Sequence, residues 1–183
     1  VQTFGRLSQP FAFQHFGLNA FADIVTIGKI TQLCATLYRD DLKPKGPLLS
    51  QTFTAASSSI EAALTVLEAL QQADCFGKDG QNESRHTYFA AELQKLAAKH
   101  PGKLSGPHGC GMMIALTPGD GSSEAAGQLV HALFDAGLMS FVAGSQPARV
   151  RFLPPPAVTT TVHIDAAIAI IDEVLAQLQP AGS

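Results

Sequence analysis

The chain has no tryptophan, only three cysteines and few charged residues, and each shortage excludes a class of protein. Cys34, Cys75 and Cys110 lie far apart and form no Cys-x-x-Cys pair, which argues against a disulfide framework or a zinc site and suits a reducing compartment. The net charge is −3 and the basic residues are scattered, so no nucleic-acid partner is indicated. No apolar run approaches the roughly 20 residues of a membrane helix. We therefore expect a cytoplasmic protein with no metal, nucleic-acid or membrane partner.

The composition is that of a protein that forms a core. Apolar residues make up 46% of the 183 residues and charged residues 15%, and this length suits one domain or slightly more. The chain begins with Val1 rather than Met and carries no signal-peptide pattern. These features lead us to expect a fragment or a processed product of a longer protein.

Hydrophobic periodicity and turn residues predict a small α/β unit, with three or four strands against helices, behind an irregular first segment. In the helix after residue 57, Ser58 and Glu61 are expected to form a capping box. Its apolar positions should form one buried face, namely Ile60, Ala63, Leu64, Leu67 and Leu70. The predicted elements are strands at 23–27 (buried) and 34–37, helices at 58–73 and 83–99, a strand at 112–116, a helix from Ser122 or Ser123 to Gly137, strands at 138–142 and 148–153, and a helix at 161–178.

A lysine, Lys29, follows the first apolar run. Burying an ammonium group costs several kcal/mol unless the group is paired or neutral. Desolvation lowers a lysine pKa and makes the amine a usable nucleophile, as Schiff-base chemistry requires. From spacing alone, however, Lys29 is more simply explained as the first exposed residue after a strand.

Two segments resemble class III pyridoxal-phosphate aminotransferases. Asp-Ile-Val-Thr-Ile-Gly-Lys at 23–29 is similar to the stretch that ends at the cofactor lysine of that family. Val-Gln-Thr-Phe-Gly-Arg at 1–6, followed by Phe-Ala-Phe-Gln-His-Phe-Gly at 11–17, is also similar to it. The resemblance implies that Lys29 carries the cofactor as a Schiff base and that Gln2 hydrogen-bonds the cofactor's 3-hydroxyl. The alternative for Gln2 is an exposed terminal residue.

Two further matches extend the resemblance to about residue 178. Ser-Gln-Thr-Phe at 50–53 precedes a helix, and a hydroxyl at such a place suits an anion. The family implies that Thr52 reaches across a homodimer to the partner's cofactor phosphate; ordinary cap and turn chemistry is the alternative. In Arg-Val-Arg-Phe-Leu-Pro-Pro at 149–155, Arg149 and Arg151 share one strand face. Arg151 matches the family's substrate-carboxylate arginine, and otherwise forms a surface ion pair; Arg149 reads as a solvated neighbour.

The remaining motifs do not indicate a catalytic or metal-binding site. His-Gly-Cys-Gly at 108–111 suggests a nucleophile, but it matches a Gly-rich bend that enters a strand in the family's small domain. The histidines show no metal-ligand spacing.

The chain also departs from the family pattern. Residues 30–34 replace a Gly-rich stretch and look more like the lysine 6-aminotransferase branch, and residues 54–56 replace a Gly-Gly-Asn. The family's phosphate-binding turn, ring-stacking aromatic and pyridine aspartate have no counterpart in this chain. Without that aspartate the cofactor's electron sink is weakened, so we expect the chain alone to be inactive.

The resemblance therefore implies an α/β fold: residues 1–66 as the end of a fold-type I large domain and residues 67–183 as the small C-terminal domain. It implies a pyridoxal 5'-phosphate-dependent transferase of ornithine, acetylornithine or lysine 6-aminotransferase type. Such an enzyme moves an ω-amino group from an amino acid to an oxo acid such as 2-oxoglutarate. The resemblance also implies a homodimer with shared active sites. A racemase, aminomutase or decarboxylase on the same scaffold, and a non-catalytic dimerisation fragment, stay open.

Overall fold

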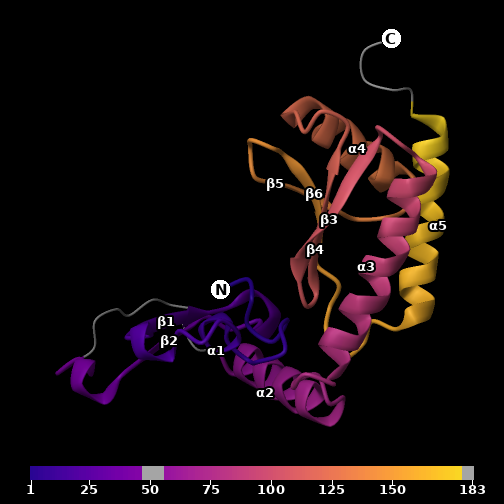
Figure 1. Ribbon diagram of the computed structural model, residues 1–183. Coiled ribbons are helices and arrows are strands. Elements are labelled where there is room, and N and C mark those ends of the chain that lie inside the picture. Colours follow the sequence, from indigo (N-terminus) through magenta and orange to yellow (C-terminus); the bar gives the residue numbers. More distant parts are fainter. Residues whose placement is uncertain (47–55, 179–183) are drawn as a thin grey trace.

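The computed structural model describes residues 1–46 and 56–178 and has two parts (Figure 1). The first contains a two-stranded antiparallel sheet, β1 (Ile24–Ile27) and β2 (Ala35–Tyr38), and helix α2 (Ser57–Gln72). The second is a four-stranded sheet with three long helices. The α/β fold class is confirmed. The short helices of the first part are α1 (Ala12–His15), η1 (Asn19–Phe21), η2 (Lys29–Thr31) and η3 (Asp40–Leu42).

The second part is an antiparallel sheet in the order β3-β4-β6-β5. Its inward side chains and those of the three helices form one core that contains Leu93, Ile114, Leu129, Val150 and Ile171. The elements are β3 (Leu104–Cys110), β4 (Met113–Pro118), β5 (Phe141–Ala143), β6 (Arg149–Phe152), α3 (Gln81–Lys99), α4 (Ser123–Asp135) and α5 (Thr161–Gln177).

The predictions for this unit are mostly confirmed. Strand β6 alternates as expected: Val150 and Phe152 are buried, while Arg149 and Arg151 lie on the opposite face. Helix α4 begins after Ser122, whose hydroxyl accepts a hydrogen bond from Ala125 N (3.1 Å).

Strand β3 is a correction. The sequence suggested only a Gly-rich bend at 108–111, but residues 104–110 pair along β4, with a register shift between Ser105 and His108. The prediction was wrong because Gly, Pro and His carry little intrinsic strand propensity, and pairing with β4 overrides it.

Three predictions for the first part are wrong. Strand β1 is not buried: Ile24 is 62% exposed, because a two-stranded sheet has no second layer over its open face. Helix α2 has Ala56 as its N-cap without a side-chain bond, so Ser58 lies inside the first turn and forms no capping box. Of the predicted α2 face only Ala63 and Leu70 are buried, and the other three members are exposed.

The first residues are held against the α/β unit by their backbone. The buried Asn82 donates through Nδ2 to Gly5 O (3.0 Å) and Leu7 O (2.9 Å). Met112 N donates to Arg6 O (2.7 Å). These contacts join a segment at the start of the chain to α3 and to the β3–β4 turn, and so fix the position of residues 2–7 relative to the sheet.

Candidate functional site

Lys29 occupies a distinctive place directly after β1. Its backbone has φ +55°, in the left-handed region that side chains other than glycine seldom adopt. The Lys29 carbonyl accepts from both Gln32 N (3.0 Å) and Gln32 Nε2 (3.1 Å), which closes the turn. The side chain is exposed. The exposure matches the simpler expectation from spacing, that Lys29 is the first exposed residue after a strand, and the open β1–β2 sheet does not cover it.

Lys29 lines a hollow of about 380 Å³ between the first part of the chain and the segment after β6. Arg6 and Leu70 form part of one wall, and residues 155–158 form another. The hollow is of small-metabolite size and joins segments that are more than 120 residues apart in the sequence.

Arg6 is the functional candidate that sequence reasoning missed. Its buried guanidinium donates through Nη1 to Pro154 O (2.7 Å) and Leu153 O (3.3 Å). Burial lowers the pKa of Arg6, and the positive charge of Arg151 lowers it further. The only signal in the sequence was a single charge within the apolar stretch 4–7.

Gln2 and Arg151 meet directly. Arg151 Nη1 donates to Gln2 Oε1 at 2.9 Å, across 149 positions of sequence. The predicted cofactor and substrate residues are thus brought to one place by the anchoring of the first segment. Lys29 and Arg6 both line the adjoining hollow. Arg6 is also close enough to Arg151 for the positive charge of Arg151 to lower the Arg6 pKa. Thr52, the predicted phosphate residue, lies outside the described residues.

The three arginines leave an excess of positive charge. No ion pair among residues 1–46 and 56–178 involves Arg6, Arg149 or Arg151. The remaining residues, 47–55 and 179–183, contain no Asp or Glu. Since the whole chain has a net charge of −3, this local positive region favours a negatively charged ligand.

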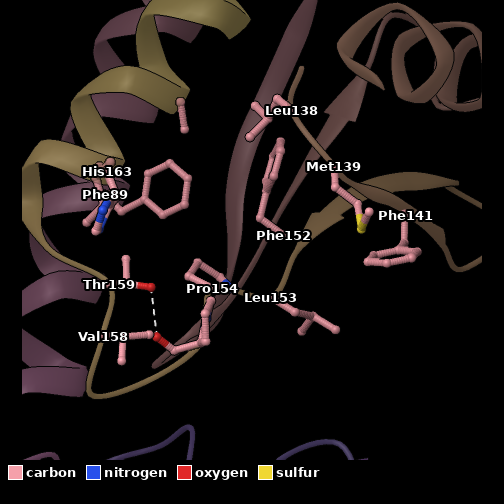
Figure 2. Close-up of a pocket in the computed structure, with 13 residues that line it drawn as sticks. Phe89, Leu138, Met139, Phe141, Phe152, Leu153, Pro154, Val158, Thr159 and His163 are labelled. Atoms are coloured by element: carbon pink, nitrogen blue, oxygen red, sulfur yellow. Dashed lines mark hydrogen bonds between the residues drawn. The ribbon is translucent and has the colours of Figure 1, made fainter. Parts of the chain in front are cut away.

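A larger cavity, of about 520 Å³, lies between α5 and the segment after β6 (Figure 2). Its walls are mainly apolar, and Figure 2 shows Phe89, Phe152 and Leu138 among them. Two of its polar atoms are engaged within the protein: Thr159 Oγ1 donates to Pro155 O (2.7 Å), and His163 Nδ1 accepts from Thr160 N (3.0 Å). This cavity offers an apolar surface rather than a set of convergent catalytic groups.

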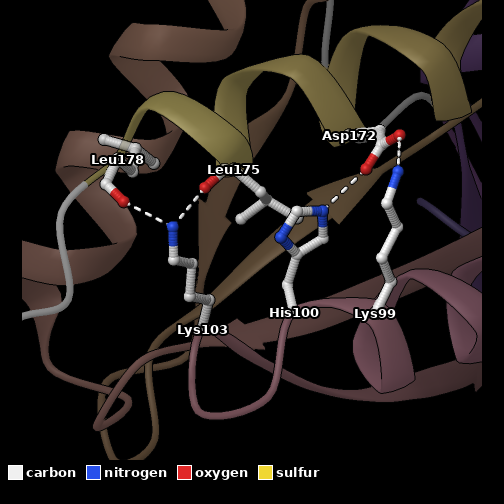
Figure 3. A network of polar contacts seen from close by, with 6 residues as sticks. All are labelled: Lys99, His100, Lys103, Asp172, Leu175 and Leu178. Carbon is white, nitrogen blue, oxygen red and sulfur yellow. Dashed lines mark hydrogen bonds and ion pairs between the residues drawn. The ribbon is translucent and has the colours of Figure 1, made fainter.

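The polar network between α3 and α5 is structural (Figure 3). Asp172 accepts from His100 Nε2 (2.6 Å) and Lys99 Nζ (2.6 Å), and the bond from His100, followed by that from Lys99, lowers the Asp172 pKa. Lys103 Nζ donates to Leu175 O (2.5 Å) and Leu178 O (2.6 Å) at the end of α5.

Within residues 1–46 and 56–178, no helix combines the length and the hydropathy that a membrane crossing requires. The same residues contain no group of three or more His, Cys, Asp or Glu side chains placed to hold a metal ion.

Comparison with known proteins confirms the predicted resemblance. No protein-family model matches the chain. It is similar to the L-lysine-epsilon aminotransferase of Mycobacterium tuberculosis, with 27% identity over 179 residues that cover 93% of this chain and 37% of the relative. It is also similar to the acetylornithine aminotransferase of Gloeobacter violaceus, with 28% identity over 186 residues that cover 97% of this chain and 43% of the relative.

Solved structures give the same result. A lysine aminotransferase from M. tuberculosis, in the internal aldimine form, superposes with a TM-score of 0.73 at 26% identity, over 92% of this chain and 38% of the other. The fold is therefore that of part of a fold-type I aminotransferase. The chain spans about two fifths of the length of the curated relatives it matches.

Proposed function

We propose that this chain is the C-terminal part of a pyridoxal-phosphate-dependent aminotransferase, one that moves an ω-amino group from an amino acid to an oxo acid such as 2-oxoglutarate. The observation that carries the proposal is the hydrogen bond between Arg151 and Gln2. The resemblance assigns Gln2 to the cofactor and Arg151 to the substrate, and such residues must lie at one site. The similarity over more than nine tenths of the chain supports the same assignment.

The residues present fit part of pyridoxal phosphate. Lys29 offers an accessible amine at the edge of a hollow of about 380 Å³, and Gln2 offers an amide that can bond a ring hydroxyl. When bound, the cofactor supplies an aldehyde and an electron-accepting ring. Thr52, which the resemblance assigns to the phosphate of the partner's cofactor, lies outside the described residues.

Each side chain then has a defined task. Lys29 Nζ would hold the cofactor. Once the substrate amine has displaced it, the freed amine would take the proton from the substrate Cα as a general base and deliver it to C4′ of the cofactor as a general acid. Arg151 binds the substrate carboxylate through two parallel hydrogen bonds, which a planar guanidinium allows. Arg6 is a positioning residue: its bonds to Leu153 O and Pro154 O hold the segment that follows Arg151.

The surface of the first part supports the view that more protein covers it. Phe21 is 80% exposed and Ile24 62% exposed, and the neighbouring Phe16 and Leu18 are also exposed. Exposed apolar groups of this density are typical of an interaction surface. We accordingly assign residues 1–66 to the end of a large cofactor-binding domain and residues 67–183 to the small domain. We also propose a cytoplasmic homodimer in which Thr52 serves the partner's site, and we expect the chain alone to be inactive.

The test is covalent trapping. The purified chain is mixed with pyridoxal phosphate, its visible absorption is recorded, and borohydride reduction is followed by peptide mapping. We expect a visible band and a label on Lys29, both lost in Lys29→Ala but kept in Lys78→Ala, whose side chain is 92% exposed. A band that appears only when the upstream part of the protein is restored would make the chain a fragment that cannot bind cofactor alone. No label on Lys29 in either form would refute the proposal.

A further inference from the structure

We propose that Gln32 is a positioning residue for Lys29: its side-chain amide holds the Lys29 carbonyl and so keeps the lysine in the backbone conformation that directs its amine into the hollow. The inference rests on the proposed function for the role of Lys29. It goes beyond that function because it assigns a task to residues 30–34, which depart from the family pattern. The resemblance implies a Gly-rich stretch there, and glycine has no side-chain donor.

Gln32 holds Lys29 through two hydrogen bonds to one oxygen atom. The Lys29 carbonyl accepts from Gln32 N (3.0 Å) and from Gln32 Nε2 (3.1 Å). The first bond closes the short helix η2, which ends at Gln32, and any residue with a backbone N–H could form it. Only the second bond depends on the side chain. Glycine at position 32 would therefore keep the turn and lose the second bond.

Both ends of this turn have a backbone conformation that is unfavourable for residues with a side chain. Lys29 has φ +55° and Gln32 has φ +56°, in the left-handed region. Among residues 1–46 and 56–178, four residues other than glycine have a positive φ, and three of them line the hollow: Lys29, Gln32 and Ala157. Such conformations persist only where surrounding contacts hold them, and they cluster at functional sites. The turn at Lys29 therefore needs a restraint, and the bond from Gln32 Nε2 supplies one.

The residues after Lys29 are anchored on helix α2. Helix η2 contacts α2, and Leu70 of α2 lines the same hollow as Lys29 and Gln32. Thr31 is buried, and its Oγ1 donates to Leu33 O (2.7 Å). These contacts fix residues 31–33. A loss of restraint at the Lys29 carbonyl should therefore change the conformation of Lys29 itself.

The backbone has to direct the Lys29 side chain, because no charged neighbour does so. The side chain is exposed, and no ion pair within the described chain involves Lys29. The direction of the Cα–Cβ bond relative to strand β1 depends on φ, so a negative φ would turn the side chain elsewhere. Gln32 Nε2 thus acts on the amine indirectly: once the carbonyl is released, Lys29 can relax to a negative φ and its amine spends less time in the hollow.

The test labels the 183-residue chain with salicylaldehyde and cyanoborohydride, without pyridoxal phosphate, and maps the modified peptides. The measured quantity is the ratio of the labelling rates at Lys29 and at Lys78, whose side chain is 92% exposed. We expect Lys29 to be labelled several-fold faster, because the hollow holds the aldehyde beside its amine. Gln32→Met, similar in length but without a donor, should lower the ratio about threefold or more, the factor that one lost hydrogen bond implies. Gln72→Met, at an exposed position outside the hollow, should leave the ratio unchanged.

A second variant separates the side-chain bond from the folding of the turn. Gln32→Gly adopts a positive φ without strain and keeps the backbone bond, so its far-UV circular dichroism should match that of the unsubstituted chain while the labelling ratio falls as in Gln32→Met. An unchanged ratio in Gln32→Gly, or equal labelling of Lys29 and Lys78 in the unsubstituted chain, would overturn the inference. Neither result depends on pyridoxal phosphate. The proposed function is refuted separately, by the absence of a pyridoxal-phosphate label on Lys29.

Discussion

Replacing Asn82 should release the first segment of the chain from the sheet. Asn82 is fully buried in the first turn of α3, and its amide donates to Gly5 O and Leu7 O. In Asn82→Ala both hydrogen bonds are lost, at about 1 kcal/mol each, and two carbonyls are left without this donor. The expected loss in the free energy of unfolding is about 2–4 kcal/mol, equivalent to a drop of about 5–15 °C in Tm for a chain of this size.

Asn82→Asp gives a sharper version of the same prediction, since it changes the amide nitrogen to oxygen with almost no change in shape. A carboxylate facing two carbonyl oxygens is repelled, so the pKa of the introduced aspartate should be raised in the folded state. The folded state then binds more protons than the unfolded state at neutral pH. The stability of this variant should therefore fall as pH rises from about 4 to 7, relative to the unsubstituted chain.

The assay is urea unfolding followed by far-UV circular dichroism at both pH values. Gln81→Ala is the matched control, because residue 81 is the exposed neighbour in the same helical turn. If Asn82→Ala lies within about 0.5 kcal/mol of Gln81→Ala, the anchoring role of this amide is refuted. An Asn82→Asp variant as stable as the unsubstituted chain at pH 7 would contradict the proposed direction of the two hydrogen bonds.

Five other substitutions test three further features of the structure by the same unfolding assay. Gly111 has φ +52°, and a Cβ there would lie 2.2 Å from Arg6 O. Gly111→Ala should therefore lower the free energy of unfolding by about 2 kcal/mol or more, because the backbone must shift to relieve the clash. Gly127→Ala, in the interior of α4 with open space around it, should instead gain about 0.5–1 kcal/mol; equal effects would contradict this account. In α2, Leu70→Ala should lower the free energy of unfolding by about 2–5 kcal/mol and Leu64→Ala, at a position 51% exposed, by less than about 1 kcal/mol. Similar losses at both positions would instead support the buried face predicted from the sequence, which includes both leucines. Asp172→Asn should lose about 1 kcal/mol at neutral pH, and because the Asp172 pKa is lowered in the folded state, the difference from the unsubstituted chain should shrink as pH falls through the acid range. A constant difference from pH 7 to pH 3 would count against that pair.

Local patterns in the sequence were sufficient for much of the α/β unit. The buried positions Phe89, Leu93 and Leu96 of α3 follow from helical spacing, and the cap at Ser122 follows from hydrogen-bonding chemistry within four residues. The shared face of Arg149 and Arg151 follows from the period of two in a strand. Each of these properties depends only on neighbours along the chain.

Contacts between distant segments decided the rest. Nothing local in α2 shows which side of the helix will be covered, and the β1–β2 sheet stays open because no second layer lies over it. Strand β3 forms against its own residue propensities because β4 offers hydrogen-bonding partners.

The candidate site divides in the same way. Lys29, Thr52, Gln2 and Arg151 were predicted from motifs, and their roles stay predictions. The meeting of Gln2 with Arg151, the buried Arg6 and the hollow beside Lys29 depend on how residues 2–7 are held by Asn82 and by the β3–β4 turn. The sequence determines which side chains and which local elements are available. Only the tertiary structure brings together groups about 150 residues apart, because their distance depends on packing and not on chain spacing.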